Sequence, residues 1–193
     1  MTRMCGLKPL EYAINKLNNK SLCVEIGCYY AGWTKYLSTQ FDSVIAFQTP
    51  KTEKLNNVGT TDGEFSEDGL KWKELMRSRL PEKYHGRYSF DLLAEQVEDL
   101  NNVMTILHHS PPIVPFSYEF DLFTYDISRD PTEQLRHYKW WRNKGKPGSV
   151  MLMGIYDVKP YDNFQITTDE FLSQIDHKWE KIPVDERYIL IYL

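Results

Sequence analysis

The stretch Leu22–Leu37, LCVEIGCYYAGWTKYL, decides the fold of this chain. It begins with a short apolar run of the kind that forms a buried strand, and it ends in a pattern typical of the first turns of a helix. Between the two lies a turn that holds Gly27 and Gly32. Gly27 permits a sharp turn, and Gly32 permits close approach to the backbone. The turn is therefore either a place where a ligand reaches the backbone or only a tight corner between strand and helix.

Further apolar runs follow along the chain, bounded by turn residues and separated by helical patterns. Apolar runs of roughly four to eight residues that alternate with helices are typical of a parallel sheet covered by helices. We predict an α/β fold: a doubly wound, mostly parallel Rossmann-like sheet with helices on both faces and a C-terminal antiparallel hairpin. The predicted parallel strands are 22–27, 44–48, 103–108, 121–126 and 150–156, and the hairpin strands are 179–184 and 187–193.

The remaining segments predict a single domain over residues 1–193, because no repeat, linker or low-complexity tract interrupts the pattern. An N-terminal helix is expected within residues 1–20, and the stretch 145–149, GKPGS, is expected to be a turn. The polar segment 51–88 is expected to be an insert or lid-like segment beside the pocket. The other predicted helices are 32–39, 66–80, 89–100, 131–144 and 167–175.

The composition limits the partners and the compartment. The net charge is −4, and no block of Lys or Arg occurs. Binding along a phosphate backbone needs a basic face, so no nucleic acid partner is expected. No run approaches the roughly 18 apolar residues of a membrane span, so no membrane contact is expected either. The 3 cysteines are an odd number without metal-ligand spacing, which favours free thiols in a reducing compartment and predicts a cytoplasmic protein.

Several stretches, taken in order, resemble the class I S-adenosylmethionine-dependent methyltransferases. VEIGCYYAGWT, residues 24–34, resembles the first motif of that family in the form E-I-G-x-Y-x-x-G-x-[ST]. DLFTYD at 121–126, a helix, KPGS at 146–149 and a strand ending in YD at 156–157 are similar to the family's strand four, helix, K-P-G-G turn and strand five. The order is more specific than any one motif. The resemblance runs from Leu22 onward and is greatest to the branch that methylates hydroxyls of sugars and small molecules.

The resemblance implies S-adenosylmethionine as cofactor and gives the first turn a role. Glu25, Gly27 and Gly32 would surround the methionyl part of the cofactor, with Cys28 and Tyr29 in the same loop.

Other positions are implied to contact the nucleoside part of the cofactor. The family carries an acidic residue for the ribose hydroxyls where this chain has Gln48, whose amide can still accept one hydrogen bond and donate another. His109 lies where the adenine edge is usually contacted, and Asp126 lies at the end of strand four. Trp33 or Trp72 could stack on the ring, although packing in the core is the favoured role for both.

The resemblance also implies a catalytic and metal site. Asp126 and Asp157, at the ends of strands four and five, match positions that hold a Mg²⁺-type cation in this branch, and two carboxylates suit such an ion. Arg129 stands where the family has a His that acts as the base, and arginine cannot take up a proton. Asp130 or His109 would have to substitute for it, although an alternative role for Asp130 is to cap the following helix.

Three functions follow from these expectations. The favoured one is O-methylation of a small molecule or sugar by an S-adenosylmethionine-dependent enzyme, with a small-molecule acceptor as partner. The alternative is a catalytically inactive, methyltransferase-like binding or assembly module, which Gln48 and Arg129 motivate. An NAD-linked oxidoreductase is disfavoured, because the turn lacks G-x-G-x-x-G and no acidic residue ends the second strand. The oligomeric state is not determined by the sequence.

Overall fold

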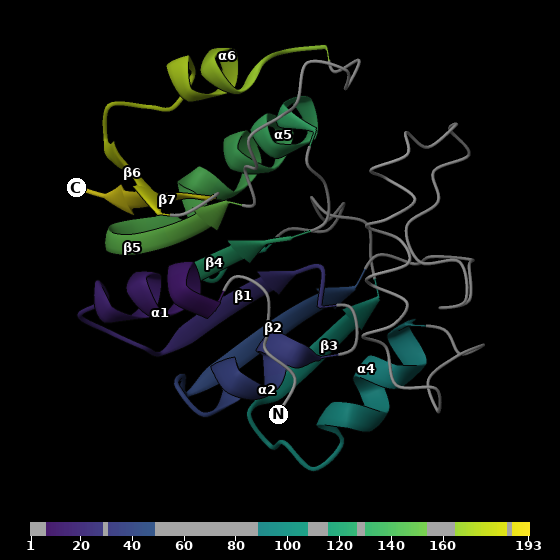
Figure 1. The fold of residues 1–193 in the computed structure, drawn as a ribbon. Coiled ribbons are helices and arrows are strands. Elements are labelled where there is room, and N and C mark those ends of the chain that lie inside the picture. Colours follow the sequence, from purple (N-terminus) through teal and green to yellow (C-terminus); the bar gives the residue numbers. More distant parts are fainter. Residues whose placement is uncertain are drawn as a thin grey trace.

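A seven-stranded mixed sheet organises the chain in the computed structural model, which describes residues 7–28, 31–48, 89–107, 116–126, 130–153, 165–184 and 187–193. The strand order is β3-β2-β1-β4-β5-β7-β6 (Figure 1). The first five strands are mutually parallel, and β7 is antiparallel to both β5 and β6. The predicted Rossmann-like fold with a C-terminal hairpin is confirmed. The strands are β1 (Leu22–Ile26), β2 (Ser43–Gln48), β3 (Val103–Leu107), β4 (Phe120–Tyr125), β5 (Gly145–Met153), β6 (Trp179–Val184) and β7 (Arg187–Tyr192).

Helices cover both faces of this sheet, as the apolar strands require. Alternate residues of each strand point to opposite faces, and they join two different hydrophobic clusters. One cluster lies under α1 and α2, with α4 beside α2, and the other lies under α5 and α6 (Figure 1). The helices are α1 (Leu7–Asn15), α2 (Gly32–Ser38), α4 (Ser89–Val97), α5 (Pro131–Trp141), the 3₁₀ turn η3 (Arg142–Lys144) and α6 (Thr168–Ser173).

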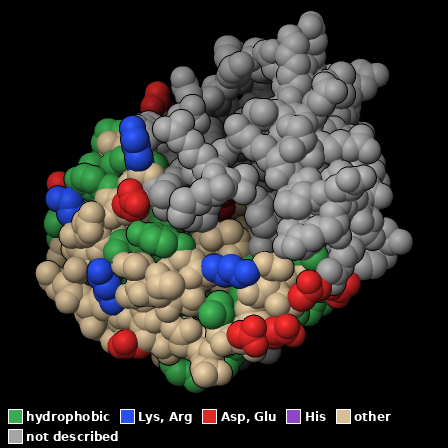
Figure 2. All heavy atoms as spheres, turned by 60° about the horizontal axis from the view of Figure 1, so that its bottom comes forward, with side chains coloured by type: hydrophobic (Ala, Val, Ile, Leu, Met, Phe, Trp, Pro, Cys, Tyr) green, Lys and Arg blue, Asp and Glu red, His purple; other side chains and the backbone are tan. Residues whose placement is uncertain are grey.

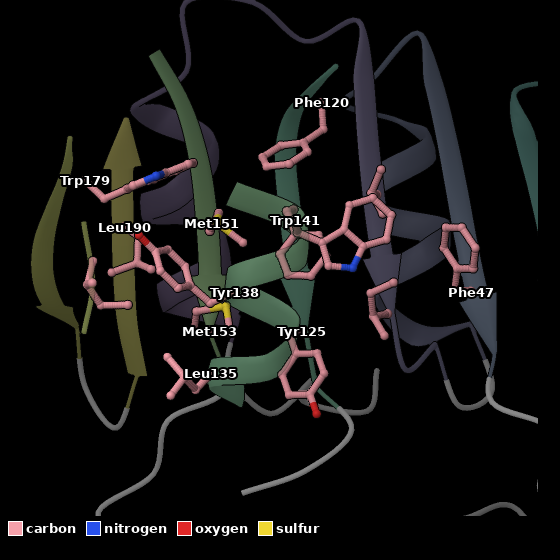
Figure 3. Close-up of a cluster of buried hydrophobic side chains, with 14 of the residues drawn as sticks. Phe47, Phe120, Tyr125, Leu135, Tyr138, Trp141, Met151, Met153, Trp179 and Leu190 are labelled. Atoms are coloured by element: carbon pink, nitrogen blue, oxygen red, sulfur yellow. The ribbon is translucent and has the colours of Figure 1, made fainter. Parts of the chain in front are cut away.

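The cluster under α5 is built around one tryptophan. Trp141, at the end of α5, is fully buried, and its ring lies 5.8 Å from that of Phe47, centroid to centroid (Figure 3). The ring of Phe123 lies 5.1 Å from the Trp141 ring. Phe116 packs on it from the segment before β4, at 5.0 Å. These edge-on and tilted contacts hold α5 against β2 and β4.

Most predicted boundaries agree with the structure to within two residues, but two helices are shorter than expected. α4 ends at Val97 instead of Leu100, and α5 ends at Trp141 instead of Lys144, because Arg142–Lys144 form the 3₁₀ turn η3. The N-terminal helix, α1, lies inside the predicted range 1–20. The start of α6 is set by a capping box in which Thr167 accepts from the N–H of Glu170. The helix predicted at 66–80 lies outside the described residues. Among the helices of the described part, none is both long and apolar enough to cross a membrane.

The predicted turn at 145–149 is wrong, because these residues open β5. Gly145 pairs with Phe120, and the register then shifts so that Leu122 pairs with Val150. Gly148 has a φ of 86°, which glycine adopts without strain. The Ser149 hydroxyl donates to the Phe120 carbonyl at 2.6 Å and accepts from the Lys146 N–H at 2.9 Å. The Pro-Gly pair thus forms an irregularity within a strand, which its sequence alone does not distinguish from a turn.

Candidate functional site

The carboxyl ends of β1, β2 and β4 meet at the topological switch point of the sheet. The chain passes from β1 to β2 on one side, whereas β4 lies on the other side of β1. Two backbone hydrogen bonds keep these ends level: Gly27 N–H donates to the Phe47 carbonyl, and Asp126 N–H donates to the Ile26 carbonyl, both at 3.0 Å. Open α/β sheets bind ligands in the crevice at such a point. The residues that follow these three strands therefore define the candidate site.

Two of the described residues in the turn after β1 have a left-handed backbone. Gly27 has a φ of 94°, as its predicted role in a sharp turn requires. The second is Ala31, with a φ of 67°, and it stands directly before α2. Its N–H donates to the Cys28 carbonyl at 2.8 Å, and its carbonyl accepts from the Lys35 N–H at 3.1 Å. Left-handed backbone in a residue with a Cβ is strained, and such strain gathers at functional sites. Gly32 is instead the first residue of α2.

Glu25 is a buried carboxylate at the centre of this corner. It points to the α2 side of the sheet, where the Thr34 hydroxyl donates to its Oε2 at 2.7 Å. Its side chain is only 3% exposed. Burial raises the pKa of Glu25 to about 7, and the charge of Asp126 acts in the same direction, whereas the Thr34 hydrogen bond lowers it. Glu25 is thus an acid whose charge can be gained near neutral pH, and a cation placed beside it would favour the charged form.

Cys28 is buried in the turn after β1. Its thiol lies 3.4 Å from the Phe47 carbonyl and 3.7 Å from the Glu25 carbonyl, within reach of a weak hydrogen bond. Burial, and then the charge of Glu25, raise the pKa of the Cys28 thiol well above its ordinary value. A protonated, buried thiol is not a nucleophile, and the cofactor-binding role of Cys28 stays a prediction.

Gln48 and Trp33 occupy very different surroundings. Gln48 ends β2 beside Leu107 of β3, and it is buried at the same edge as Gly27. Trp33, in α2, packs in the hydrophobic cluster that also contains Leu10. That is the packing role favoured for Trp33 from the sequence, and its stacking on a cofactor stays a prediction.

The acidic candidates after β4 have separate positions. Asp126 directly follows the strand, close enough to influence Glu25. Asp130 is the N-cap of α5, and its Oδ1 accepts from the Thr132 N–H at 2.9 Å. This is the capping role that the sequence offered as an alternative to catalysis. Across the described ranges no three His, Cys, Asp or Glu side chains gather as a metal site.

Five sequence-predicted residues, Tyr29, Trp72, His109, Arg129 and Asp157, lie outside the described residues.

The structure adds site residues that sequence reasoning did not single out. Thr34 holds Glu25, and its only signal was its place as the last residue of the first motif. Ala31 carries the second left-handed conformation, which nothing in its residue type indicates. Tyr125 ends β4 with a buried hydroxyl that has no hydrogen-bond partner within the described part of the chain. A tyrosine in an apolar strand is indistinguishable from a packing residue until its direction is known.

Comparison with solved structures identifies the fold. An rRNA methylase from Streptococcus thermophilus matches 100% of this chain and 99% of its own, with a TM-score of 0.59 and 13% sequence identity. The N-methyltransferase NodS from Bradyrhizobium japonicum matches 96% of this chain and 90% of its own, with a TM-score of 0.57 and 10% identity. TrmK from M. capricolum, in complex with S-adenosylhomocysteine, matches 99% of this chain and 68% of its own, with a TM-score of 0.53 and 14% identity.

The chain therefore has the Rossmann-like methyltransferase fold, and its neighbours in structure are class I S-adenosylmethionine-dependent methyltransferases. At these identities the likeness is one of fold. No protein-family description matches the sequence. No curated protein matches it either.

Proposed function

We propose that this chain is an S-adenosylmethionine-dependent methyltransferase that methylates a hydroxyl of a small molecule or sugar. The observation that carries the proposal is the corner at the switch point. There Glu25 is buried and held by Thr34, beside two left-handed residues, Gly27 and Ala31. A tight corner alone needs no buried carboxylate, whose desolvation destabilises the fold unless a partner offsets it.

The residues at this corner fit the cofactor. S-adenosylmethionine supplies a methyl group on a positively charged sulfonium, and it carries an ammonium group on its methionyl part. Glu25 would accept a hydrogen bond from that ammonium group, and Gly27 and Gly32 would let the methionyl part approach the backbone. Gln48 would accept one hydrogen bond from the ribose and donate another. An amide forgoes the charge-assisted bond of a carboxylate, so binding should be weaker than with Asp or Glu at position 48.

Methyl transfer by direct displacement requires chiefly that two substrates are held in line, which removes several kcal/mol of barrier. In this proposal Asp126 orients the acceptor hydroxyl, and Asp130 or His109 takes its proton. Asp126 and Asp157 together would hold Mg²⁺, which lowers the pKa of a bound hydroxyl. The chemistry of these two carboxylates supports the cation.

The charge distribution favours a small acceptor over RNA. The net charge is −4, and several cations already have acidic partners: Lys146 with Asp121 at 3.0 Å, and Arg136 with Glu133 at 2.6 Å. On the face in Figure 2, Lys and Arg side chains of the described residues stand singly and form no basic patch. RNA is nevertheless kept as an outcome of the test, because one structural neighbour is an rRNA methylase.

One observation favours a second function, an inactive binding or assembly module of the same fold. Gln48 is buried where an acidic residue would bind the ribose, so the pocket has lost its charge at that point. The methyltransferase would turn over an acceptor, and the inactive module would not. The inactive module would also fail to bind the cofactor if Gln48 cannot bind the ribose.

We expect S-adenosylhomocysteine and S-adenosylmethionine to stabilise the protein against heat. A ligand at 100 times its Kd stabilises by about 2.7 kcal/mol, which raises the Tm of a chain of this size by roughly 5 to 10 °C. Thermal unfolding with each ligand, with and without Mg²⁺, measures this. Tritiated S-adenosylmethionine should then be tested with catechol, glucose and bulk tRNA as acceptors. If the cofactor stabilises the protein and only tRNA becomes labelled, the acceptor is RNA and not a small molecule. If the cofactor stabilises the protein but no acceptor becomes labelled, the inactive module is favoured.

A further inference from the structure

Tyr125 is placed where the sheet meets the candidate site. It is the last residue of β4, directly before Asp126, and its ring packs on that of His137 of α5, with 4.4 Å between the centroids. The side chain is 1% exposed. Its hydroxyl points away from Trp141, past the carboxyl end of the strand (Figure 3). Tyr125 therefore lies on the α5 face of the sheet, whereas Glu25 points to the α2 face.

The hydroxyl of Tyr125 differs from that of the neighbouring buried tyrosine. Tyr138, a buried residue of α5 itself, accepts a hydrogen bond from the Asp176 N–H at 2.8 Å. The Tyr125 Oη has no hydrogen-bond partner among the residues that the structure describes. Buried polar groups in folded proteins are nearly always paired, and one that is not calls for an explanation. Because the Tyr125 hydroxyl lies at the edge of the candidate site, a bound ligand would supply the hydrogen-bond partner that it lacks among the described residues.

The charges around the Tyr125 hydroxyl indicate which chemical group a ligand would place beside it. Burial raises the pKa of the Tyr125 phenol; the charges of Glu133, Asp130 and Asp126 act in the same direction, and the charge of Arg136 acts against them. The phenol is therefore a protonated donor. Burial also lowers the pKa of His137 to about 3, so the neighbouring imidazole is neutral. Arg136 is already paired with Glu133, and the charges of Asp130 and Asp126 would repel an anion, so the complementary group is a neutral oxygen or ring nitrogen with a free lone pair.

We propose that Tyr125 is a positioning residue whose hydroxyl donates a hydrogen bond to an uncharged oxygen or nitrogen of the acceptor substrate. This inference rests on the proposed function and adds the side of the pocket from which the acceptor is held. A cofactor beside Glu25 approaches from the α2 face, and an acceptor beside Tyr125 approaches from the α5 face. The two would meet over the end of β4, next to Asp126, which is the geometry that in-line transfer requires.

The test compares Tyr125→Phe with the matched control Tyr138→Phe, both of which remove one buried hydroxyl from the same cluster. Without ligand, Y138F should lower the Tm by about 2 to 4 °C, because the Asp176 N–H loses its acceptor. Y125F should leave the Tm unchanged or raise it. S-adenosylhomocysteine should bind Y125F as it binds the wild type. With the best acceptor of the panel of catechol, glucose and tRNA, Y125F should raise KM about 3- to 10-fold, the effect of one neutral hydrogen bond.

Two results would overturn the inference. If Y125F lowers the Tm without ligand as much as Y138F does, the hydroxyl is already bonded within the protein. If the Tm is kept but KM and kcat are those of the wild type, the hydroxyl does not touch the acceptor. Failure of the proposed function is seen separately, because the wild type would then not bind S-adenosylhomocysteine.

Discussion

Replacing Glu25 by Gln should make the protein more stable at pH 8 and leave its stability nearly unchanged at pH 5. The folded pKa of Glu25 is about 7, against an ordinary value of 4.5. Because the folded pKa is the higher one, this group's contribution to stability is full below about pH 4.5 and is lost as pH rises through 7. Linkage then gives a loss on the order of 2 kcal/mol between pH 5 and pH 8. The glutamine side chain of the variant would stay neutral and could still accept from Thr34.

Urea unfolding of both proteins at the two pH values measures this effect. The quantity that matters is the difference between variant and wild type, because His137 titrates in the opposite sense. Its pKa is lowered to about 3, so its contribution is present above about pH 6.5 and is lost as pH falls. The exposed Glu11 provides a matched control, and E11Q, as a surface substitution, should change the unfolding free energy by less than about 0.5 kcal/mol. Equal unfolding free energies for E25Q and wild type at pH 8 would show that Glu25 is already charged and compensated in the folded protein.

In the proposed cofactor site, the same residue would link stability to binding. A cationic ligand beside Glu25 favours the carboxylate, so binding requires the charged form that destabilises the free protein. Affinity for S-adenosylhomocysteine should therefore rise between pH 6 and pH 8 in the wild type. In E25Q it should be weaker and flat over that range. This is the stability–function conflict that a buried acid at a binding site creates.

The fold was predictable because its strands are buried on both faces. Runs such as Val44–Phe47 are continuously apolar, and only a parallel sheet between helix layers buries them in this way. The hairpin was predictable from the short turn between 179–184 and 187–193. The start of β5 was not, because Pro147 and Gly148 signal a turn whether they end a strand or distort one.

The site was predictable only in part, and the reason is again physical. Sequence motifs gave the residues that end strands, such as Glu25 and Gln48, because strand ends meet at one edge of a parallel sheet. Side-chain contacts between helices and strands depend on the direction in which each side chain points. That direction cannot be read from the residue type at one position. Thus the hold of Thr34 on Glu25 and the unpaired hydroxyl of Tyr125, seen within the described ranges, emerge only from the packed helices.

Replacing Asp121 by Ala should destabilise the protein by about 2 to 4 kcal/mol. Asp121 is a 3% exposed carboxylate at the amino end of β4. Its Oδ2 accepts from the N–H groups of Ser21 and Leu22, both at 2.9 Å, and its Oδ1 lies 3.0 Å from the Lys146 Nζ. It therefore joins the starts of β1, β4 and β5. Alanine would leave two N–H groups of the chain entering β1 without their acceptor, and a lysine without its counter-charge.

Urea unfolding of two further variants separates the contribution of the two N–H hydrogen bonds from that of the ion pair. Asp42, an exposed aspartate before β2, donates its backbone N–H to the Lys20 carbonyl, a bond that alanine keeps, so D42A should change stability by less than about 0.5 kcal/mol. K146M removes the ion pair but keeps both N–H bonds, so it should cost less than D121A, although it leaves the 3% exposed Asp121 without its counter-charge. A D121A loss no larger than that of K146M would mean that the two N–H bonds contribute nothing. The start of β1 would then be held by strand pairing alone, and the carboxylate would matter only as a charge.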